Sequence, residues 1–223
     1  MLSTIIFLPA IGAAVVAVLG RDVRVARAIA LTVVVTEFLL SLVVFLGVRS
    51  GSGDYLFVER LDWIPSLGVQ YFVGVDGLSG PLVLLNGLLG LSAVLVSWKV
   101  KERPNEYYGW LLLLQTSVMG VFLSLDLLVF FVFWELELIP MFFLISIWGT
   151  GRRDYSAMKF LLFTLFGSAF MFASIIVLYF SFPDGSRTFD ATVIADRDLV
   201  GLILPTSLVF AGFFIAFAVK LPM

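Results

Sequence analysis

Long apolar runs separated by short polar segments dominate the chain. Each run is continuous rather than alternating, so it predicts a helix and not a strand. A bilayer crossing takes about 20 apolar residues. Seven stretches are long enough: Leu2–Leu19, Ile29–Val48, Pro81–Trp98, Tyr108–Leu125, Leu127–Trp148, Phe160–Phe182 and Leu202–Met223. The pattern predicts an all-α fold, a polytopic bundle of about seven transmembrane helices.

The fourth and fifth runs follow one another almost without a break. As a single helix, residues 108–148 would be about 60 Å long, roughly twice the hydrocarbon thickness. The chain therefore has to turn, and Asp126 is the best position for the turn. We expect this side chain to be wetted at the membrane interface.

Basic residues alternate between loops and predict the orientation. Nine of them follow the first, third and fifth spans: Arg21, Arg24, Arg27, Lys99, Lys101, Arg103, Arg152, Arg153 and Lys159. The other loops hold only Arg49, Arg60, Arg187 and Arg197. The positive-inside rule then places the N-terminus outside and the basic loops on the cytoplasmic, matrix or stromal side. The opening residues lack the basic segment of a cleaved signal peptide, so we expect the first span to be retained.

Composition supports a membrane protein and excludes several functions. Hydrophobic residues make up 61% of the 223 residues and charged residues only 13%. The chain has no cysteine and no histidine, which excludes thiolate and imidazole metal sites and cysteine-held iron–sulfur clusters. A net charge of −2 makes nucleic acid a poor partner. We expect no cofactor and no metal in this chain.

Two longer loops lie on the predicted outer side. Residues 49–80 mix glycine, serine, aspartate and aromatic residues, which indicates an ordered loop with a short hairpin rather than a separate domain. Residues 183–200 carry Asp184, Asp190, Asp196 and Asp198, so we expect a solvated acidic loop.

Four ionisable residues fall inside predicted spans: Glu37, Glu135, Glu137 and Lys220. A charge at bilayer depth costs about 2.5–3.5 kcal/mol on insertion scales, so each of them calls for a reason. Such residues are functional candidates by default, with proton transport the foremost role.

Glu135 and Glu137 are two residues apart. A continuous helix turns about 200° over two residues, so we expect the carboxylates to face nearly opposite sides and not to line one pathway together. Pro140 removes the hydrogen bond to the Leu136 carbonyl and favours a kink. The structural alternative is that either glutamate is protonated and hydrogen-bonded within a packed bundle.

Lys220 lies two residues before Pro222, which interrupts the last helix. Burial favours the neutral amine, whereas a carboxylate partner favours the charged ammonium form. Lys220 would therefore load and release a proton when the partner moves. The alternative is a lysine that extends to the interface at the inner end of the span.

Besides Glu135 and Lys220, four residues are possible supporting groups: Glu137, Glu37, Thr164 and Ser168. Glu37 lies mid-span without an obvious partner, and a structural hydrogen bond and a transport role stay equally open. Thr164 and Ser168 are four residues apart on one helix face. Small and hydroxyl residues on one face favour close helix packing over a proton wire.

Three segments resemble one family. They are Phe72-Val73-Gly74-Val75-Asp76-Gly77-Leu78-Ser79, Phe133-Trp134-Glu135-Leu136-Glu137-Leu138-Ile139-Pro140-Met141 and Ala216-Phe217-Ala218-Val219-Lys220-Leu221-Pro222-Met223. Together they resemble the proton-translocating membrane subunit called chain 4, or subunit M, of respiratory and photosynthetic complex I. The first segment is shared with sister subunits and with cation/proton antiporter subunits, so it discriminates less than the other two.

The resemblance implies the N-terminal part of an antiporter-like, inverted-repeat fold. Residues 1–107 would form three spans with an external loop, and residues 108–223 an incomplete first repeat. Glu135 and Lys220 match the family's charge pair, which couples proton movement to quinone chemistry. The partners implied are the other membrane and peripheral subunits of complex I, which hold NADH, flavin, iron–sulfur clusters and quinone. The membrane would be a bacterial plasma membrane, a thylakoid or an inner organelle membrane.

The family continues beyond the position of Met223 with a histidine-bearing segment, an eighth span and a second repeat, so we expect a fragment or a truncated product. Two alternative functions stay open. One is a subunit of a multisubunit cation/proton antiporter driven by an ion gradient. The other is a structural scaffold whose buried charges only fix helix packing.

Overall fold

The computed structural model describes the chain except for residues 21, 51–54, 184, 198–201 and 222–223. Its helices are α1 (Leu2–Leu19), α2 (Val23–Ser50), α3 (Ser79–Val96), α4 (Pro104–Leu123), α5 (Leu127–Leu136), α6 (Leu138–Trp148), α7 (Arg153–Phe180), α8 (Ala191–Ala195) and α9 (Thr206–Lys220). Strands β1 (Leu56–Ile64) and β2 (Val69–Val75) form an antiparallel hairpin. Short 3₁₀ turns cover Pro65–Leu67 and Ser97–Lys99.

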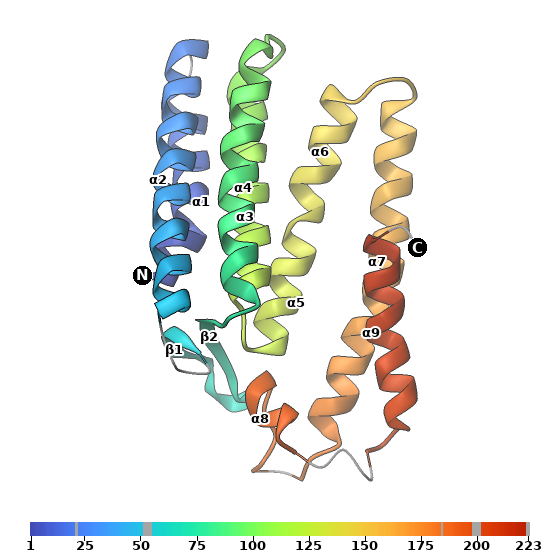
Figure 1. Ribbon diagram of the computed structural model, residues 1–223. Coiled ribbons are helices and arrows are strands. Elements are labelled where there is room, and N and C mark those ends of the chain that lie inside the picture. Colours follow the sequence, from blue (N-terminus) through green and yellow to red (C-terminus); the bar gives the residue numbers. More distant parts are fainter. Residues whose placement is uncertain (21, 51–54, 184, 198–201, 222–223) are drawn as a thin grey trace.

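The long helices run side by side as a bundle, in which α1–α4 form one group (Figure 1). The α5–α6 pair follows α4, and α7 and α9 pack against each other on the far side. Figure 1 shows α9 alongside only the lower part of α7, so α9 ends part of the way along the bundle. The fold is therefore the expected all-α transmembrane bundle.

Five segments in the described part of the chain are long and apolar enough to cross a membrane: α1, α2, α3 with its 3₁₀ end, α5–α6, and α7. The fourth and seventh predicted spans correspond to α4 and α9, which are helical but are not among the five; α9 has only 15 residues. The predicted count of seven spans is thus confirmed in part. The division at residue 107 stays a prediction, although α1 packs along α4 across it.

The hairpin expected within residues 49–80 is present at the end of the bundle where α1 begins (Figure 1). Gly68 makes its tight turn with a φ of +67°, a conformation that glycine adopts without a steric penalty. Glu59 of β1 accepts hydrogen bonds from the backbone N–H groups of Leu2 at 2.8 Å and Ser3 at 3.2 Å. Its carboxylate therefore fastens the hairpin to the N-terminus of α1, where the helix dipole favours a negative charge.

Asp76 turns the chain from β2 into α3. Its carboxylate accepts from the backbone N–H of Leu78 at 3.1 Å and of Ser79 at 2.7 Å, and the Ser79 hydroxyl accepts from the Asp76 N–H at 2.9 Å. Burial raises the pKa of Asp76, but these hydrogen bonds outweigh burial and hold the pKa below its usual value. The motif Asp76-Gly77-Leu78-Ser79 is thus a helix-starting turn.

Asp126 also begins a helix. Its carboxylate accepts from the N–H groups of Leu128 at 2.9 Å and Val129 at 3.1 Å, the N-cap arrangement, and from Gln70 of β2 at 3.1 Å. The chain turns here as predicted, but the expectation of a wetted side chain is wrong, because Asp126 is only 1% exposed. Leu127 and Ala191 complete the contact through backbone hydrogen bonds to Phe189 and Leu125, both at 2.8 Å.

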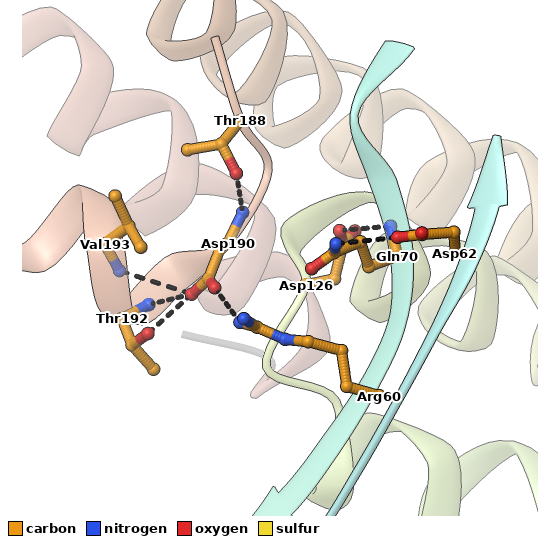
Figure 2. A network of polar contacts seen from close by, with 8 residues as sticks. All are labelled: Arg60, Asp62, Gln70, Asp126, Thr188, Asp190, Thr192 and Val193. Atoms are coloured by element: carbon orange, nitrogen blue, oxygen red, sulfur yellow. Dashed lines mark hydrogen bonds and ion pairs between the residues drawn. The ribbon is translucent and has the colours of Figure 1, made fainter. Parts of the chain in front are cut away.

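Asp190 corrects the expectation of a solvated acidic loop. It is 5% exposed, caps α8 through the N–H groups of Thr192 and Val193, and forms an ion pair with Arg60 of β1. Figure 2 shows Asp190 joined to Arg60 of β1 and Asp126 joined to Gln70 of β2. Asp196 is exposed as expected, whereas Asp184 and Asp198 lie outside the described residues. We call Arg60, Gln70, Asp126 and Asp190 the external network; it joins the hairpin, the α4–α5 turn and the α7–α9 connection.

Gly120 of α4 supplies a test of the packing. A Cβ at this position would lie 2.2 Å from the ring of Phe133 on α5, whereas one at Gly109 of the same helix meets only a backbone oxygen at 4.0 Å. We expect Gly120→Ala to lower the free energy of unfolding by about 1–3 kcal/mol, because a buried aromatic ring has to shift. Gly109→Ala, the matched control, should leave stability unchanged or raised, since alanine favours a helix by about 1 kcal/mol. Thermal unfolding of both variants in detergent measures the difference, and equal loss in both would contradict the packing.

Asp126 supplies a test of the external network through pH. Burial raises the pKa of Asp126 above its ordinary 3.8; three backbone hydrogen bonds lower it, and the nearby Asp190 charge raises it further. Between pH 3.8 and the native pKa of Asp126, the native state therefore binds more protons than the unfolded state. The contribution of Asp126 to the free energy of unfolding falls as the pH rises through this window and is constant above it. The wild-type minus Asp126→Asn difference in unfolding temperature should fall over this window. A difference that rises with pH would show a lowered pKa instead.

Candidate functional site

A break in the fifth transmembrane segment creates the site. α5 ends at Leu136 and α6 begins at Leu138, while Glu137 between them keeps right-handed helical backbone angles, with φ −66° and ψ −22°. Pro140, two residues into α6, has no N–H for the Leu136 carbonyl, as the sequence predicted. The interruption lies between two helices that continue in nearly the same direction (Figure 1). Discontinuous helices of this kind place polar groups at membrane depth.

Lys220, the last residue of α9, meets this break. Its Nζ donates a hydrogen bond to Oε1 of Glu137 in an ion pair, and the two side chains are only 16% and 19% exposed. The same Nζ lies 4.3 Å from the centre of the Trp134 ring, an additional stabilising contact for a cation. The prediction that Lys220 ends a helix holds, and Pro222 lies outside the described residues.

Glu135 is the second carboxylate near Lys220. It interacts electrostatically with the lysine, and its Oε1 is buried with no hydrogen-bond partner among the residues that the structure describes. The expectation that Glu135 and Glu137 face nearly opposite sides and do not line one pathway together stays a prediction. Only Glu137 forms the ion pair with Lys220. The direct partner of Lys220 is Glu137, not the Glu135 that the family resemblance implied.

A cavity of about 570 Å³ opens beside the ion pair. Its polar lining groups come from five elements: Asn86 of α3, Gln115 of α4, Glu137 at the α5–α6 break, Thr164 of α7 and Lys220 of α9. A water molecule takes about 30 Å³ in the liquid, so the space accommodates a chain of waters between these groups. The arrangement can exchange protons between a lysine, a carboxylate and water at membrane depth.

The hydroxyl groups of Thr164 and Ser168 on α7 form hydrogen bonds within their own helix. Thr164 donates to the Phe160 carbonyl at 2.7 Å, and Ser168 donates to the Thr164 carbonyl at 3.1 Å, both within their own helix. Between them, Gly167 lets Val219 of α9 approach so closely that a Cβ would lie 2.9 Å from it. The close α7–α9 contact that results positions Lys220, one residue after Val219. Thr164 also lines the cavity, whereas Ser168 is not among its lining residues.

Sequence reasoning missed Asn86 and Gln115 because neither is charged. Both are buried, and the Gln115 Nε2 donates a hydrogen bond to the backbone carbonyl oxygen of Asn86 at 2.8 Å. The signal available was an uncharged amide inside each of two otherwise apolar runs. Glu37, which the sequence did single out, lies away from the ion pair on α2, fully buried and next to Gln115.

Metal binding has no support in the structure. Among the residues described, there is no group of three or more aspartate, glutamate, histidine or cysteine side chains that would hold an ion. The expectation that this chain carries no cofactor stays a prediction.

The bundle has the antiporter-like membrane fold. A family described as NADH:quinone oxidoreductase/Mrp antiporter, TM matches residues 124–223. A chain of respiratory complex I from Thermus thermophilus superimposes with a TM-score of 0.83 at 32% identity, covering 100% of this chain and 44% of that one. A chain of the Mrp complex from Dietzia sp. gives a TM-score of 0.81 at 20% identity, covering 98% of this chain and 23% of that one, a likeness of fold alone.

Curated relatives of the chain are chain 4 subunits of NAD(P)H-quinone oxidoreductases. NAD(P)H-quinone oxidoreductase chain 4 1 of Nostoc sp. is 38% identical over 224 residues, 100% of this chain and 41% of that protein. NAD(P)H-quinone oxidoreductase chain 4 2 of Microcystis aeruginosa is 40% identical over 222 residues, 99% of this chain and 40% of that protein. The resemblance to the N-terminal portion of chain 4 is thus confirmed, and the chain is an integral, multi-pass membrane protein. It spans about two fifths of the length of these relatives.

The choice of partner for Lys220 is testable by double-mutant cycles. We expect Glu137→Gln and Lys220→Met to show a coupling of about 1–3 kcal/mol in the free energy of unfolding, because the pair is largely buried. The exposed Arg103–Glu106 pair, with side chains 56% and 46% exposed, is the matched control and should show about 0.5 kcal/mol or less. Denaturation in mixed micelles measures both cycles. A larger coupling of Lys220 to Glu135 than to Glu137 would reverse the assignment.

Proposed function

We propose that the chain forms part of a proton-translocating membrane subunit of an NAD(P)H- or ferredoxin-dependent quinone oxidoreductase. The observation that carries the proposal is the meeting of Lys220 with two carboxylates at a broken helix, beside a cavity with room for water. A lysine–carboxylate set costs free energy at this depth, so its presence calls for a function. The identity of 38–40% with chain 4 proteins over the whole chain supplies the class of enzyme.

Lys220 is the proton carrier in this proposal. While its ammonium contacts Glu137, the ion pair keeps the proton on the amine. When Glu137 is neutralised or moves away, the ammonium loses that attraction in a medium of low dielectric constant and releases its proton to cavity water. Glu135, whose Oε1 has no hydrogen-bond partner within the described part of the chain, is the alternative position for the ammonium. Lys220 thus alternates between two carboxylates on either side of one turn of the chain.

The energy for this movement comes from partner subunits in the proposal. The relatives named above are subunits of NAD(P)H-quinone oxidoreductases, and the matched structure from Thermus thermophilus is a respiratory complex I with bound NADH. We propose that redox centres and quinone belong to the partners and that this chain supplies only charged groups and packing. The membrane orientation, with the basic loops inside, is part of the same proposal.

The alternative is a subunit of a cation/proton antiporter. The matching family covers such proteins, and the Mrp complex has the same fold. The two proposals differ in what drives proton movement. Redox subunits that copurify with the chain support the first, whereas sodium-driven proton movement without an electron donor supports the second.

Proton pumping tests the role of Lys220 and the carboxylates. In vesicles that contain the complex isolated with this chain, we expect Lys220→Ala and Glu135→Gln to lower the ratio of protons moved to electrons transferred, with assembly intact. Glu137→Gln should have the same effect, because it removes the ion-pair partner seen here. A pH-sensitive dye and quinone reduction, followed together, give the ratio.

Glu106→Gln, an exposed neutralisation at the basic end, is the control and should leave the ratio unchanged. An unchanged ratio in the Lys220 and Glu135 variants would reject the proposal and favour the scaffold interpretation, in which neutral replacements of similar size are tolerated.

A further inference from the structure

A second polar cluster lies between α2, α3 and α4, away from the ion pair. It consists of Glu37, Asn86 and Gln115, and we call it the Glu37 cluster. Glu37 is fully buried, and the other two side chains are at most 8% exposed. In a bundle with an otherwise apolar interior, such a concentration of polar groups on three helices calls for an explanation.

The cluster contains several polar atoms without partners. Both carboxylate oxygens of Glu37 and Nδ2 of Asn86 have no hydrogen-bond partner among the residues that the structure describes. Buried polar side-chain atoms are nearly always hydrogen-bonded, to protein or to ordered water. Three such atoms on neighbouring helices indicate a site that takes up water or a proton.

Close helix packing holds the cluster in place. The amide of Gln115 lies over Gly90 of α3, where a Cβ would be 2.6 Å from it. At Gly87, one turn earlier, α3 approaches Phe38 and Ser41 of α2 equally closely. Any side chain at these two glycines would displace Gln115 or α2. Gln115 is therefore fixed between the Asn86 carbonyl, to which it donates, and the Glu37 carboxyl group beside it.

The cluster adjoins the cavity of the Lys220 site. Asn86 and Gln115 line that cavity on one side, and Glu137 and Lys220 line it on the other. Glu37 lies directly behind Gln115 and outside the lining. Gln115 and Asn86 thus stand between the cavity water and the Glu37 carboxylate.

We propose that Glu37 is a second proton-holding site, which exchanges protons with the Glu137–Lys220 pair through the cavity and the Gln115–Asn86 pair. In the exchange, water that enters beside Gln115 and Asn86 carries the proton from the cavity: a hydronium ion next to Glu37 protonates a carboxylate oxygen and leaves a water molecule, and the reverse step returns the proton. The proton-holding property rests on the cluster alone. Its use in translocation rests on the proposed function above.

The chemistry of the cluster favours a proton over a metal ion. The unpartnered atom of Asn86 is its amide nitrogen, and Gln115 also presents an amide nitrogen; both are hydrogen-bond donors that do not ligate cations. Hard cations take six or more oxygen ligands. The cluster has one carboxylate, and no basic side chain in the described residues forms an ion pair with it. A carboxyl group so placed is stable in its neutral, protonated form.

Infrared spectroscopy of the purified protein in lipid nanodiscs, with the subunits that copurify, tests the protonated state. We expect a carboxyl C=O band that Glu37→Gln removes and that the exposed control Glu106→Gln leaves in place. Loss of the band in Glu37→Gln supports the proposal, and an unchanged band overturns it. A shift of the wild-type band on adding sodium ions at constant pH would also overturn it, since it would show a cation site.

Exchange into heavy water tests the route. We expect the Glu37 band to shift rapidly in wild type and severalfold more slowly in Gln115→Met, which replaces the amide by an apolar side chain of similar size. Asn86→Leu is the second variant: it keeps the backbone carbonyl that holds Gln115 but removes the side-chain amide from the cavity wall, and it should slow exchange in the same way, while Ser92→Ala on the exposed side of α3 should not. The retained C=O band shows in each case that the site is intact. Equally fast exchange in both variants overturns the route.

Pumping distinguishes this inference from the proposed function. If both hold, Glu37→Gln lowers the proton-to-electron ratio and Glu37→Asp restores part of it. A lowered ratio in Lys220→Ala with an unchanged ratio in Glu37→Gln overturns the coupling and leaves the proposed function standing. An unchanged ratio in both, with the Glu37 band and its exchange as expected, rejects the proposed function and supports the protonation site.

Discussion

The contact between Lys220 and Glu137 is the constraint on which the other features of the site depend. An ammonium group at membrane depth is costly unless a carboxylate and polar surroundings meet it. The carboxylate lies at the junction between α5 and α6, with Pro140 in the following turn. The amine becomes available because α9 ends at Lys220, held there by close packing of Gly167 against Val219. One helix break and one helix end thus produce a single charged site in an apolar bundle.

The apolar pattern was sufficient to predict the bundle, since continuous runs of about 20 residues have few alternatives to transmembrane helices. It also located the turn at Asp126 and the hairpin. The pattern did not show what surrounds Asp126 and Asp190, because their burial depends on segments more than 50 residues distant: Arg60 and Gln70 of the hairpin. Sequence distance hides such contacts, and a polar loop looks solvated until its partners are placed.

The candidate site was predicted in its residues but not in its pairing. Glu135, Glu137 and Lys220 were evident because charges are rare inside membrane spans. Their pairing could not be predicted, because the position of Lys220 relative to α5 and α6 depends on how α9 packs against α7 and not on local sequence. Asn86 and Gln115 escaped notice since an uncharged amide hardly alters the hydropathy of a run, although it changes the chemistry of the cavity wall.

The external network and the Lys220 site are two ends of one mechanical unit. α5 has ten residues and is about 15 Å long, with Asp126 capping its first turn and Glu135 near its last. Asp190 caps α8 on the path that leads to α9, and backbone hydrogen bonds tie Phe189 and Ala191 to the start of α5. The helix that carries the carboxylates and the segment that leads to the lysine are therefore fixed to the same extramembrane contact. A shift of this contact reaches Glu135 and Glu137 through a short helix, whereas the position of Lys220 also depends on the packing of α9 against α7. Relative movement of the two is what would exchange one carboxylate partner for the other.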